Sequence, residues 1–411
     1  MQLPALCYGI VVKRFNEMRL RILFPAACVS LILMHLGCTG VNDQDIPTIV
    51  ISSDVACDRH PMDSLFEIDE YVILEETPES SISVISRLTV SSGEIIILDN
   101  KEKLVFFGMD GKFRYCLQKV GHARDEYISA SDFDVRDDTL YVLDKMGRKI
   151  QVYQRDGTYV RSIGMEPARG IKVLDNGMAV NHEFGLADGT SQCYCYEYLG
   201  EGNGRKEIVH NPYLAGRAFT FPGADDGFYE SKDGMICYLI PYDEHIYAID
   251  RASGEVRPWV RMVIGEGGRT ISADDSRKTV QDVLGSPVPS NVFSFYLLDE
   301  LLVFSYYDTG DRRQYVFHDI REGTIHNGPL GFDKHRIPPM IVSYDTDEGG
   351  PKKLLCIVPS SFIKNSYDRL EDKESYPILG EISGNIAGQE NPVLVFYKRK
   401  KHHGEIRSEG R

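Results

Sequence analysis

One short segment of this 411-residue chain concentrates side chains that can form charged hydrogen bonds. Residues 121–127 read GHARDEY and include these polar or charged side chains: His122, Arg124, Asp125, Glu126 and Tyr127. At the rim of a rigid body, such groups could bind a polar ligand through charge-assisted hydrogen bonds. Alternatively, Glu126 and Tyr127 could only tie one structural module to the next. The segment is therefore a candidate ligand-binding loop with a structural alternative.

A second segment combines aromatic rings with carboxylates. Residues 217–230, RAFTFPGADDGFYE, contain these candidate ligand-binding residues: Phe219, Phe221, Asp225, Asp226 and Tyr229. Ring faces beside acidic acceptors suit the C–H faces and hydroxyls of a sugar. The same residues could instead cap a groove between two modules. Adjacent acids point apart on an extended chain, so Asp225 and Asp226 predict neither an acid–base pair nor a calcium site.

Motifs typical of enzymes are missing from the sequence. It contains no Gly-x-Ser-x-Gly nucleophile elbow, no Walker phosphate loop and no His pair with zincin spacing. The cysteines and histidines have no metal-ligand spacing either. We therefore predict no catalytic residue, no metal and no cofactor. Asp99 and Asp144 recur at equivalent places in successive repeats, which indicates turn residues that accept hydrogen bonds from backbone amides.

Internal repeats predict the fold that must position these segments. Residues 98–114, LDNKEKLVFFGMDGKFR, align with residues 143–161, LDKMGRKIQVYQRDGTYVR, and both contain an Asp-Gly dipeptide typical of tight hairpins. Looser copies complete six units, which begin near residues 93, 138, 174, 233, 295 and 352. A period of about 40–50 residues with several short strands is typical of a β-propeller. We predict an all-β, six-bladed β-propeller of four-stranded antiparallel blades, in which residues 64–74 form an N-terminal strand that closes the last blade.

The N-terminus predicts export. From Met18, two arginines and a short apolar run lead to Leu-Gly-Cys at residues 36–38, which resembles a lipobox with lipid attachment at Cys38. The apolar run is too short for a bilayer span of about 20 residues, although an uncleaved membrane anchor remains the alternative. We expect the following organisation: a signal peptide at 1–37, a polar tether at 38–62, the propeller at 63–400 and a basic flexible tail at 401–411.

The charge balance limits the partners. The chain has 46 Lys and Arg against 61 Asp and Glu, a formal net charge of −15. Binding to nucleic acid requires a basic face that contacts phosphates, so we predict no nucleic-acid partner. The lipid anchor would attach the protein to a membrane of the cell envelope, so we expect the membrane to be a partner.

Several of these segments also resemble a known family. Residues 138–164, the preceding GHARDEYISASDFDV and the closing NPVLVFYK are similar to the six-bladed β-propeller lipoproteins of Bacteroidota, relatives of NHL-repeat propellers. The resemblance covers about residues 63 to 400 and implies a lipid-anchored protein at the periplasmic or surface-exposed face of the outer membrane. Members of that family usually carry Gly-x-Gly-Pro-Gly-Glu-Tyr between the first two blades. Glu126 and Tyr127 match this motif, whereas Ala123, Arg124 and Asp125 depart from it.

Two functional hypotheses follow from this sequence. The first is a non-enzymatic binding or scaffolding module for a glycan, a peptide or an envelope protein. The second is a propeller enzyme of the lactonase, lyase or glycosidase type with a metal or acid site in the central channel. An enzyme of this kind should bring at least three acids, His or Asn from different blades to a common point near the axis.

Overall fold

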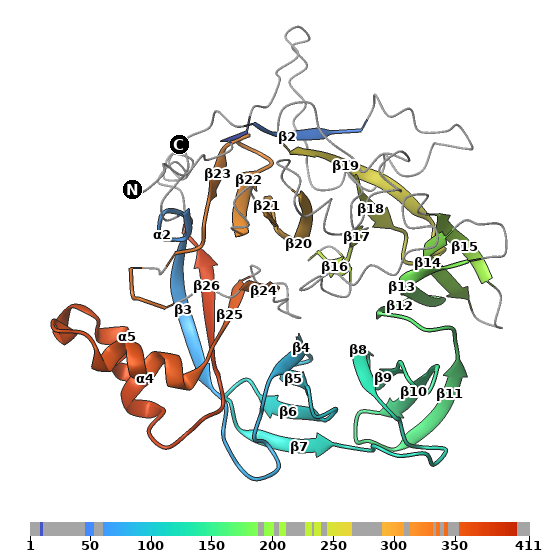
Figure 1. Cartoon of the computed structure of the whole chain (residues 1–411), viewed down its shortest axis with the longest axis horizontal. Helices are drawn as coiled ribbons and strands as arrows, with labels where there is room; N and C mark the ends of the chain where they lie inside the picture. The colour runs from blue at the N-terminus through green and yellow to red at the C-terminus, as the bar shows by residue number, and fades with distance from the viewer. Residues whose placement is uncertain are drawn as a thin grey trace, which may run out of the picture.

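Six β-sheets stand side by side around a common axis (Figure 1). This computed structural model describes residues 9–10, 46–52, 61–187, 193–200, 205–210, 227–231, 234–239, 245–264, 290–307, 313–331, 334–337, 341–343 and 353–400. Each sheet contains four antiparallel strands that form a blade, ordered from the axis outward, and the sheet of blade 4 carries two further strands at its outer edge. The six-bladed β-propeller with four-stranded blades is therefore confirmed.

The strands of the six blades have the following bounds. Blade 1 consists of β4 (Ile85–Ser91), β5 (Glu94–Asp99), β6 (Leu104–Gly108) and β7 (Phe113–Leu117). Blade 2 consists of β8 (Ala130–Arg136), β9 (Thr139–Asp144), β10 (Lys149–Gln154) and β11 (Tyr159–Gly164). Blade 3 consists of β12 (Gly170–Leu174), β13 (Gly177–Ala187), β14 (Cys193–Gly200) and β15 (Arg205–His210). Blade 4 consists of β16 (Phe228–Glu230), β17 (Ile236–Leu239), β18 (His245–Ile249) and β19 (Val256–Ile264). Blade 5 consists of β20 (Ser290–Leu298), β21 (Leu301–Tyr307), β22 (Arg313–Asp319) and β23 (Ile325–Gly328). Blade 6 consists of β24 (Ile341–Ser343), β25 (Leu354–Val358), β26 (Val393–Arg399) and β3 (Phe66–Ile73).

The ring closes where a strand from the N-terminal part of the chain pairs with a strand near its C-terminal end. Strand β3 lies antiparallel to β26, and Val393 pairs with Ile73 while Val395 pairs with Tyr71. The prediction that residues 64–74 close the last blade is therefore confirmed. Closure of this kind leaves no open edge between the first and last blades.

The sequence of β5 shows why each blade needs two neighbours. Its run EIIILD is apolar at consecutive positions, as expected for a strand that is buried on both faces. Ile95 and Ile97 pack with Phe396 of blade 6, whereas Ile96 and Leu98 pack with Phe133 of blade 2. The hydrophobic core therefore lies between the blades rather than inside any one of them.

The repeat boundaries in the structure are shifted from the predicted ones by one strand. Residues 93 and 138 directly precede β5 and β9, which are the second strands of their blades. The Asp-Gly turns, with Gly111 at φ 76° and Gly157 at φ 85°, connect the third and fourth strands. Five of the six predicted units thus begin at or after the end of the innermost strand of their blade, whereas the unit predicted to begin near residue 295 starts within β20.

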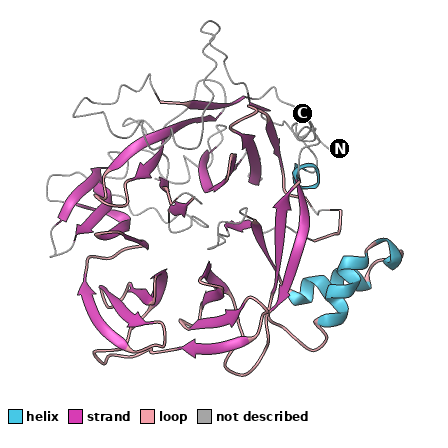
Figure 2. Cartoon of the chain, turned by 180° about the vertical axis from the view of Figure 1, so that it is seen from behind, coloured by secondary structure: helices cyan, strands magenta, loops and turns pink. Residues whose placement is uncertain are grey.

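A helical hairpin interrupts blade 6 and was not predicted. Helices α4 (Ser360–Asp368) and α5 (Pro377–Asn385), joined through the 3₁₀ helix η4 (Lys373–Ser375), lie between β25 and β26. They project from the edge of the ring of strands (Figure 2). Ile363, Leu379 and Ile382 anchor the hairpin in the core cluster of blades 4 to 6.

Part of the expected tether belongs to the folded body. Strand β2 (Thr48–Ser52) lies parallel to the outermost strand of blade 4, with Thr48 opposite Arg261, and the two-residue β1 (Gly9–Ile10) pairs with β2. The short helix α2 (Pro61–Leu65) then leads into β3. Residues 46–52 thus cover an outer sheet edge. The folded body therefore includes residues before the predicted boundary at residue 63.

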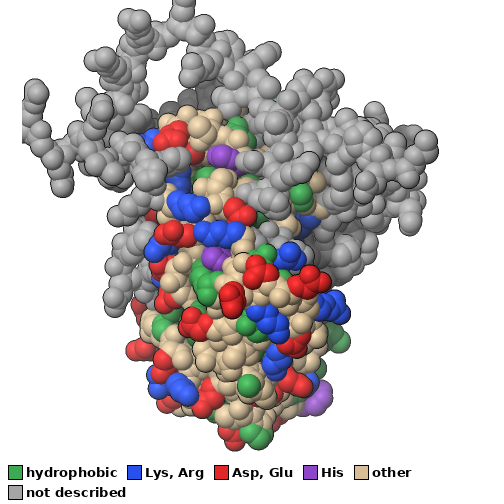
Figure 3. All heavy atoms as spheres, turned by 90° about the vertical axis from the view of Figure 1, so that its left-hand side faces the viewer, with side chains coloured by type: hydrophobic (Ala, Val, Ile, Leu, Met, Phe, Trp, Pro, Cys, Tyr) green, Lys and Arg blue, Asp and Glu red, His purple; other side chains and the backbone are tan. Residues whose placement is uncertain are grey.

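The described surface carries charges of both signs. On the side of the wheel drawn in Figure 3, acidic and basic side chains are intermixed over the described residues. Among the helices that the structure describes, none is both long and apolar enough to span a bilayer.

Candidate functional site

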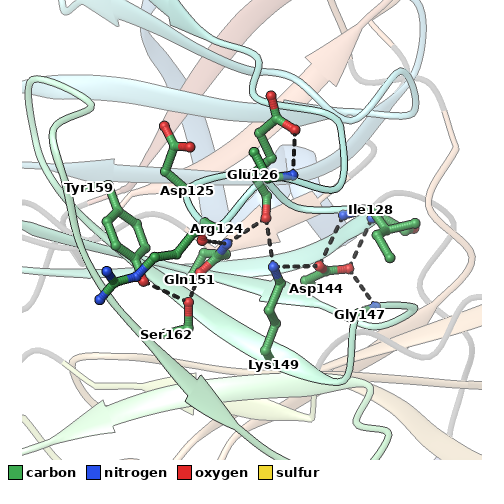
Figure 4. Close-up of polar contacts among 12 residues, drawn as sticks. Arg124, Asp125, Glu126, Ile128, Asp144, Gly147, Lys149, Gln151, Tyr159 and Ser162 are labelled. Carbon is green, nitrogen blue, oxygen red and sulfur yellow. Dashed lines mark hydrogen bonds and ion pairs between the residues drawn. The ribbon is translucent and has the colours of Figure 1, made fainter.

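The candidate loop at residues 121–127 runs from the outermost strand of blade 1 to the innermost strand of blade 2. In an antiparallel blade, the connection from the fourth strand to the next blade lies at the same end of the strands as the turn between the second and third strands. Val84 and the segments 99–103, 118–129 and 144–149 therefore meet on one surface, which we call the loop face. Figure 4 shows the part of this face formed by the loop and blade 2.

Tyr127 anchors the loop in the interface between blades 1 and 2. Its ring is fully buried beside Phe106 and Phe133. Its hydroxyl donates to the carbonyl oxygen of Glu102 over 2.8 Å and accepts from the Lys119 amide over 3.2 Å. Burial raises the pKa of the Tyr127 phenol, so the group remains a neutral donor. Tyr127 is thus a structural residue of the site.

Glu126 shapes the loop from within. Its carboxylate accepts from the Ala123 amide over 2.8 Å and lies directly over Gly121. A Cβ atom at position 121 would come within 2.0 Å of this carboxylate, so a larger residue there would displace Glu126 from the Ala123 amide. Glu126, the acid that matches the motif of the propeller lipoproteins, therefore accepts a hydrogen bond from the loop's own backbone.

Blade 2 holds the main chain of the loop with three side chains of β10. Lys149, Gln151 and Tyr153 alternate along the strand, so they project from the same face. The Lys149 ammonium donates to the carbonyl of Glu126 over 2.7 Å, and Gln151 donates to the carbonyl of Arg124 over 3.0 Å and also to that of Glu126. The Tyr153 hydroxyl donates to the carbonyl of Asp125 over 2.9 Å. Three consecutive carbonyls are thus fixed. The three donors were not predicted from the sequence, where their only signal was the alternating pattern KIQVYQ of β10.

The two recurring aspartates fix the turns on either side of the loop. Asp144 accepts from the amides of Ile128 and Ser129, each over 3.0 Å, and from that of Gly147 over 2.8 Å. Asp99 accepts from the Lys101 amide over 2.9 Å in the corresponding turn of blade 1. The prediction that Asp99 and Asp144 are turn residues is confirmed.

The remaining loop side chains face solvent from this fixed main chain. His122 and Arg124 are exposed, and the Arg124 guanidinium lies 5.7 Å from the centre of the Tyr159 ring. Asp125 is half-buried and accepts from the Lys119 ammonium over 3.1 Å, which lowers the pKa of the Asp125 carboxyl. His122 and Arg124 are therefore the loop groups best placed to meet a ligand.

Charged residues also lie on the innermost strands of four successive blades. Arg87 of β4 pairs with Asp132 of β8 over 3.0 Å, and Lys172 of β12 contacts Asp134 over 3.1 Å and Glu230 of β16 over 2.8 Å. Burial raises the pKa of Asp132 to about 6, and Arg87 partly opposes this effect. Burial alone would lower the pKa of Lys172, but the charges of Asp134 and Glu230 raise it.

These inner charges act as fastenings between blades. The second carboxylate oxygen of Asp132 accepts from the Ile171 amide over 2.8 Å, and that of Asp134 accepts from the Val173 amide over 2.7 Å. Both amides belong to the innermost strand of blade 3, whose inner edge has no strand partner in the described sheet. Within the described ranges, no group of three or more His, Cys, Asp or Glu is arranged to hold a metal ion. The convergence expected of a channel enzyme is thus not found among the residues that the structure describes.

The second candidate segment is placed only in part. Tyr229 on β16 is 8% exposed, and its ring packs edge-on against Phe295 and Tyr296, so it belongs to the core. These other candidates lie outside the described residues: Cys38, Phe219, Phe221, Asp225 and Asp226.

The geometry can be compared with known proteins. A Bacteroides fragilis NCTC 9343 protein whose name describes it as exported has a solved structure with a TM-score of 0.69 and 15% sequence identity, covering 87% of this chain and 100% of its own. A member of the duf4221 family from Bacteroides vulgatus ATCC 8482 gives a TM-score of 0.50 at 8% identity, covering 82% of this chain and 98% of its own. At these identities, both similarities establish the fold alone. No curated protein matches the sequence. A family model does match residues 46–398, and the chain therefore belongs to the family described as Domain of unknown function (DUF4934).

Proposed function

We propose that this protein is an exported, lipid-anchored binding module whose ligand contacts the loop face of blades 1 and 2. The observation that carries the proposal is the rigid loop main chain, because three blade 2 side chains fix consecutive carbonyls and leave His122 and Arg124 exposed. Preorganised groups lose less entropy on binding than groups that must first be ordered.

Export and anchoring rest on separate observations. The Leu-Gly-Cys ending at residues 36–38 supports lipidation of Cys38, and a structural relative from Bacteroides fragilis is described as exported. Replacing Cys38 with Ser should move the protein from the membrane fraction to the soluble fraction. Unchanged fractionation of C38S would argue against lipid anchoring.

Binding through the loop face is tested with one pair of matched variants. The Arg124 side chain is exposed and lies over the Tyr159 ring, while its carbonyl is the group anchored by blade 2, so R124A should fold normally. The control is R321A, which removes an exposed arginine from blade 5. Purified full-length protein is applied to arrays of glycans and peptides. Signals should weaken in R124A and persist in R321A, and equal signals from both variants would refute this site.

The enzyme alternative has less support. The inner-strand acids that could act in a channel already pair with Arg87 or Lys172 and accept from backbone amides. A binding role requires no such convergence, so it is the function that the described geometry supports best.

A further inference from the structure

Exposed apolar side chains gather on the loop face. Six large hydrophobic side chains are exposed in the described part of the chain, and four of them are on this face: Val84 at 56%, Val120 at 48%, Ile128 at 37% and Met146 at 68%. The other two, Val160 and Ile320, lie elsewhere, on the outer edge of blade 2 and in a turn of blade 5. Clustered apolar exposure of this kind marks interaction sites, whereas isolated residues need no explanation.

Hydrogen bonds connect the four residues into one surface. The carbonyl of Val84 accepts from the Asn100 amide over 2.9 Å, and the Tyr127 hydroxyl donates to Glu102 in the same turn. Val120 bridges to Tyr127 across the loop. The Ile128 amide and the turn that carries Met146 are both held by Asp144. The apolar groups are therefore held in fixed positions relative to one another.

The loop face is also locally basic on an acidic protein. Its three segments contain seven Lys or Arg and five Asp or Glu, a net charge of +2, while the whole chain has −15. The carboxylates of Asp99, Asp144 and Glu126 accept from backbone amides, and that of Asp125 accepts from Lys119. The acids are thus largely satisfied within the face. Among its bases, Lys103 is buried and donates to two carbonyls and Arg148 pairs with Glu166, whereas Lys101 and Arg124 are exposed and can meet a partner.

We propose that the loop face binds an acidic polypeptide segment that carries apolar side chains. This inference rests on the proposed function and specifies its ligand. The flexible side chain of Met146 and the branched side chains beside it can pack against the apolar side chains of a peptide, since methionine adapts to varied apolar partners. Sugar faces favour aromatic platforms, and none of the six exposed hydrophobic residues is aromatic. An anionic bilayer would be repelled by the overall charge of −15 and would favour interfacial Trp or Tyr. A protein partner therefore fits the face better than a glycan or a membrane.

The test uses a phage-displayed library of random 12-residue peptides, selected on the full-length protein. Selected peptides should have net negative charge together with Leu, Ile, Val or Phe, and raised salt should weaken their binding. The Kd of the best peptide should rise at least tenfold in I128S/M146S. It should stay unchanged in V160S/I320S, the matched control with two exposed apolar residues off the loop face.

Each other outcome has a defined meaning. Peptides that bind I128S/M146S as tightly as the wild type but lose affinity for R124A would overturn the apolar-partner inference and leave the proposed site standing. If neither variant affects binding, both proposals fall. Failure to enrich any peptide, or I128S/M146S-sensitive binding to phosphatidylglycerol vesicles or to a second copy of the chain instead, would also overturn the inference.

Discussion

The Tyr127 hydroxyl provides a direct test of how the loop is positioned. In Y127F the ring stays buried between blades 1 and 2, so no cavity forms, but the hydroxyl's bonds to Glu102 and Lys119 are lost. Losing the bond to Glu102 should cost about 1 kcal/mol, and leaving the Lys119 amide unpartnered adds a similar amount, about 2 kcal/mol together. If the loop opens locally, this corresponds to roughly 30-fold faster exchange of its protected amides.

Hydrogen exchange measured by mass spectrometry on peptides that span residues 117–129 would detect this change. Y71F serves as the control, because the Tyr71 hydroxyl of blade 6 donates to the exposed Glu381 carboxylate, away from the loop. Such a surface substitution should change stability by less than about 0.5 kcal/mol. Exchange in Y127F that matches the wild type would refute the view that buried Tyr127 holds the loop.

Two further predictions concern the loop, and a third concerns the inner strands. The Ala side chain in G121A would clash with the Glu126 carboxylate, so loop exchange should rise and peptide affinity fall, whereas G164A, with open space at its Cβ, should change neither. Q151L removes the donor to two loop carbonyls and should cost about 1–3 kcal/mol in urea unfolding, with unaltered stability as the contrary result. The pKa of Asp132 is raised in the folded protein, so folding favours the protonated carboxyl. The stability that this protonation contributes is complete below about pH 4 and is lost as pH rises through about 6. The difference in unfolding free energy between wild type and D132N should therefore change by about 3 kcal/mol between pH 4 and pH 8, and a constant difference would contradict this.

The loop differs from the motif of the propeller lipoproteins that the sequence resembles, and the structure explains how this difference is accommodated. Positions 123–125 differ from the usual Gly-Pro-Gly, yet the main chain of the loop is held, because side chains of β10 donate to the carbonyls of residues 124–126. The matching residues, Glu126 and Tyr127, are those whose side chains shape and anchor the turn.

Local sequence patterns predicted the fold well because propeller blades repeat local features. Asp-Gly turns and apolar alternation lie within a few residues of each other, and they predicted the blades and the closing strand. The hairpin α4–α5 was missed because its helices are short and begin beside Pro359 and Pro377, with few apolar positions to reveal a period. The strand at 48–52 was missed because its partner is more than 200 residues away.

The candidate site could be located but not understood from sequence. The polar loop was recognised by its composition, but its supports on β10 lie more than 20 residues further along the chain. The apolar character of the loop face arises from Val84, Val120, Ile128 and Met146, which are unremarkable in sequence and meet only when blades 1 and 2 pack together. Side chains that converge through packing leave no local pattern.

Hydrogen exchange of the full-length protein with and without a saturating library-selected peptide would test most directly whether the loop face is the binding surface. Bound peptide should slow exchange in residues 118–129 and 144–149 and leave the blade 5 turn at 320–324 unchanged. Protection confined to other blades, or none on the loop face at saturation, would contradict the account.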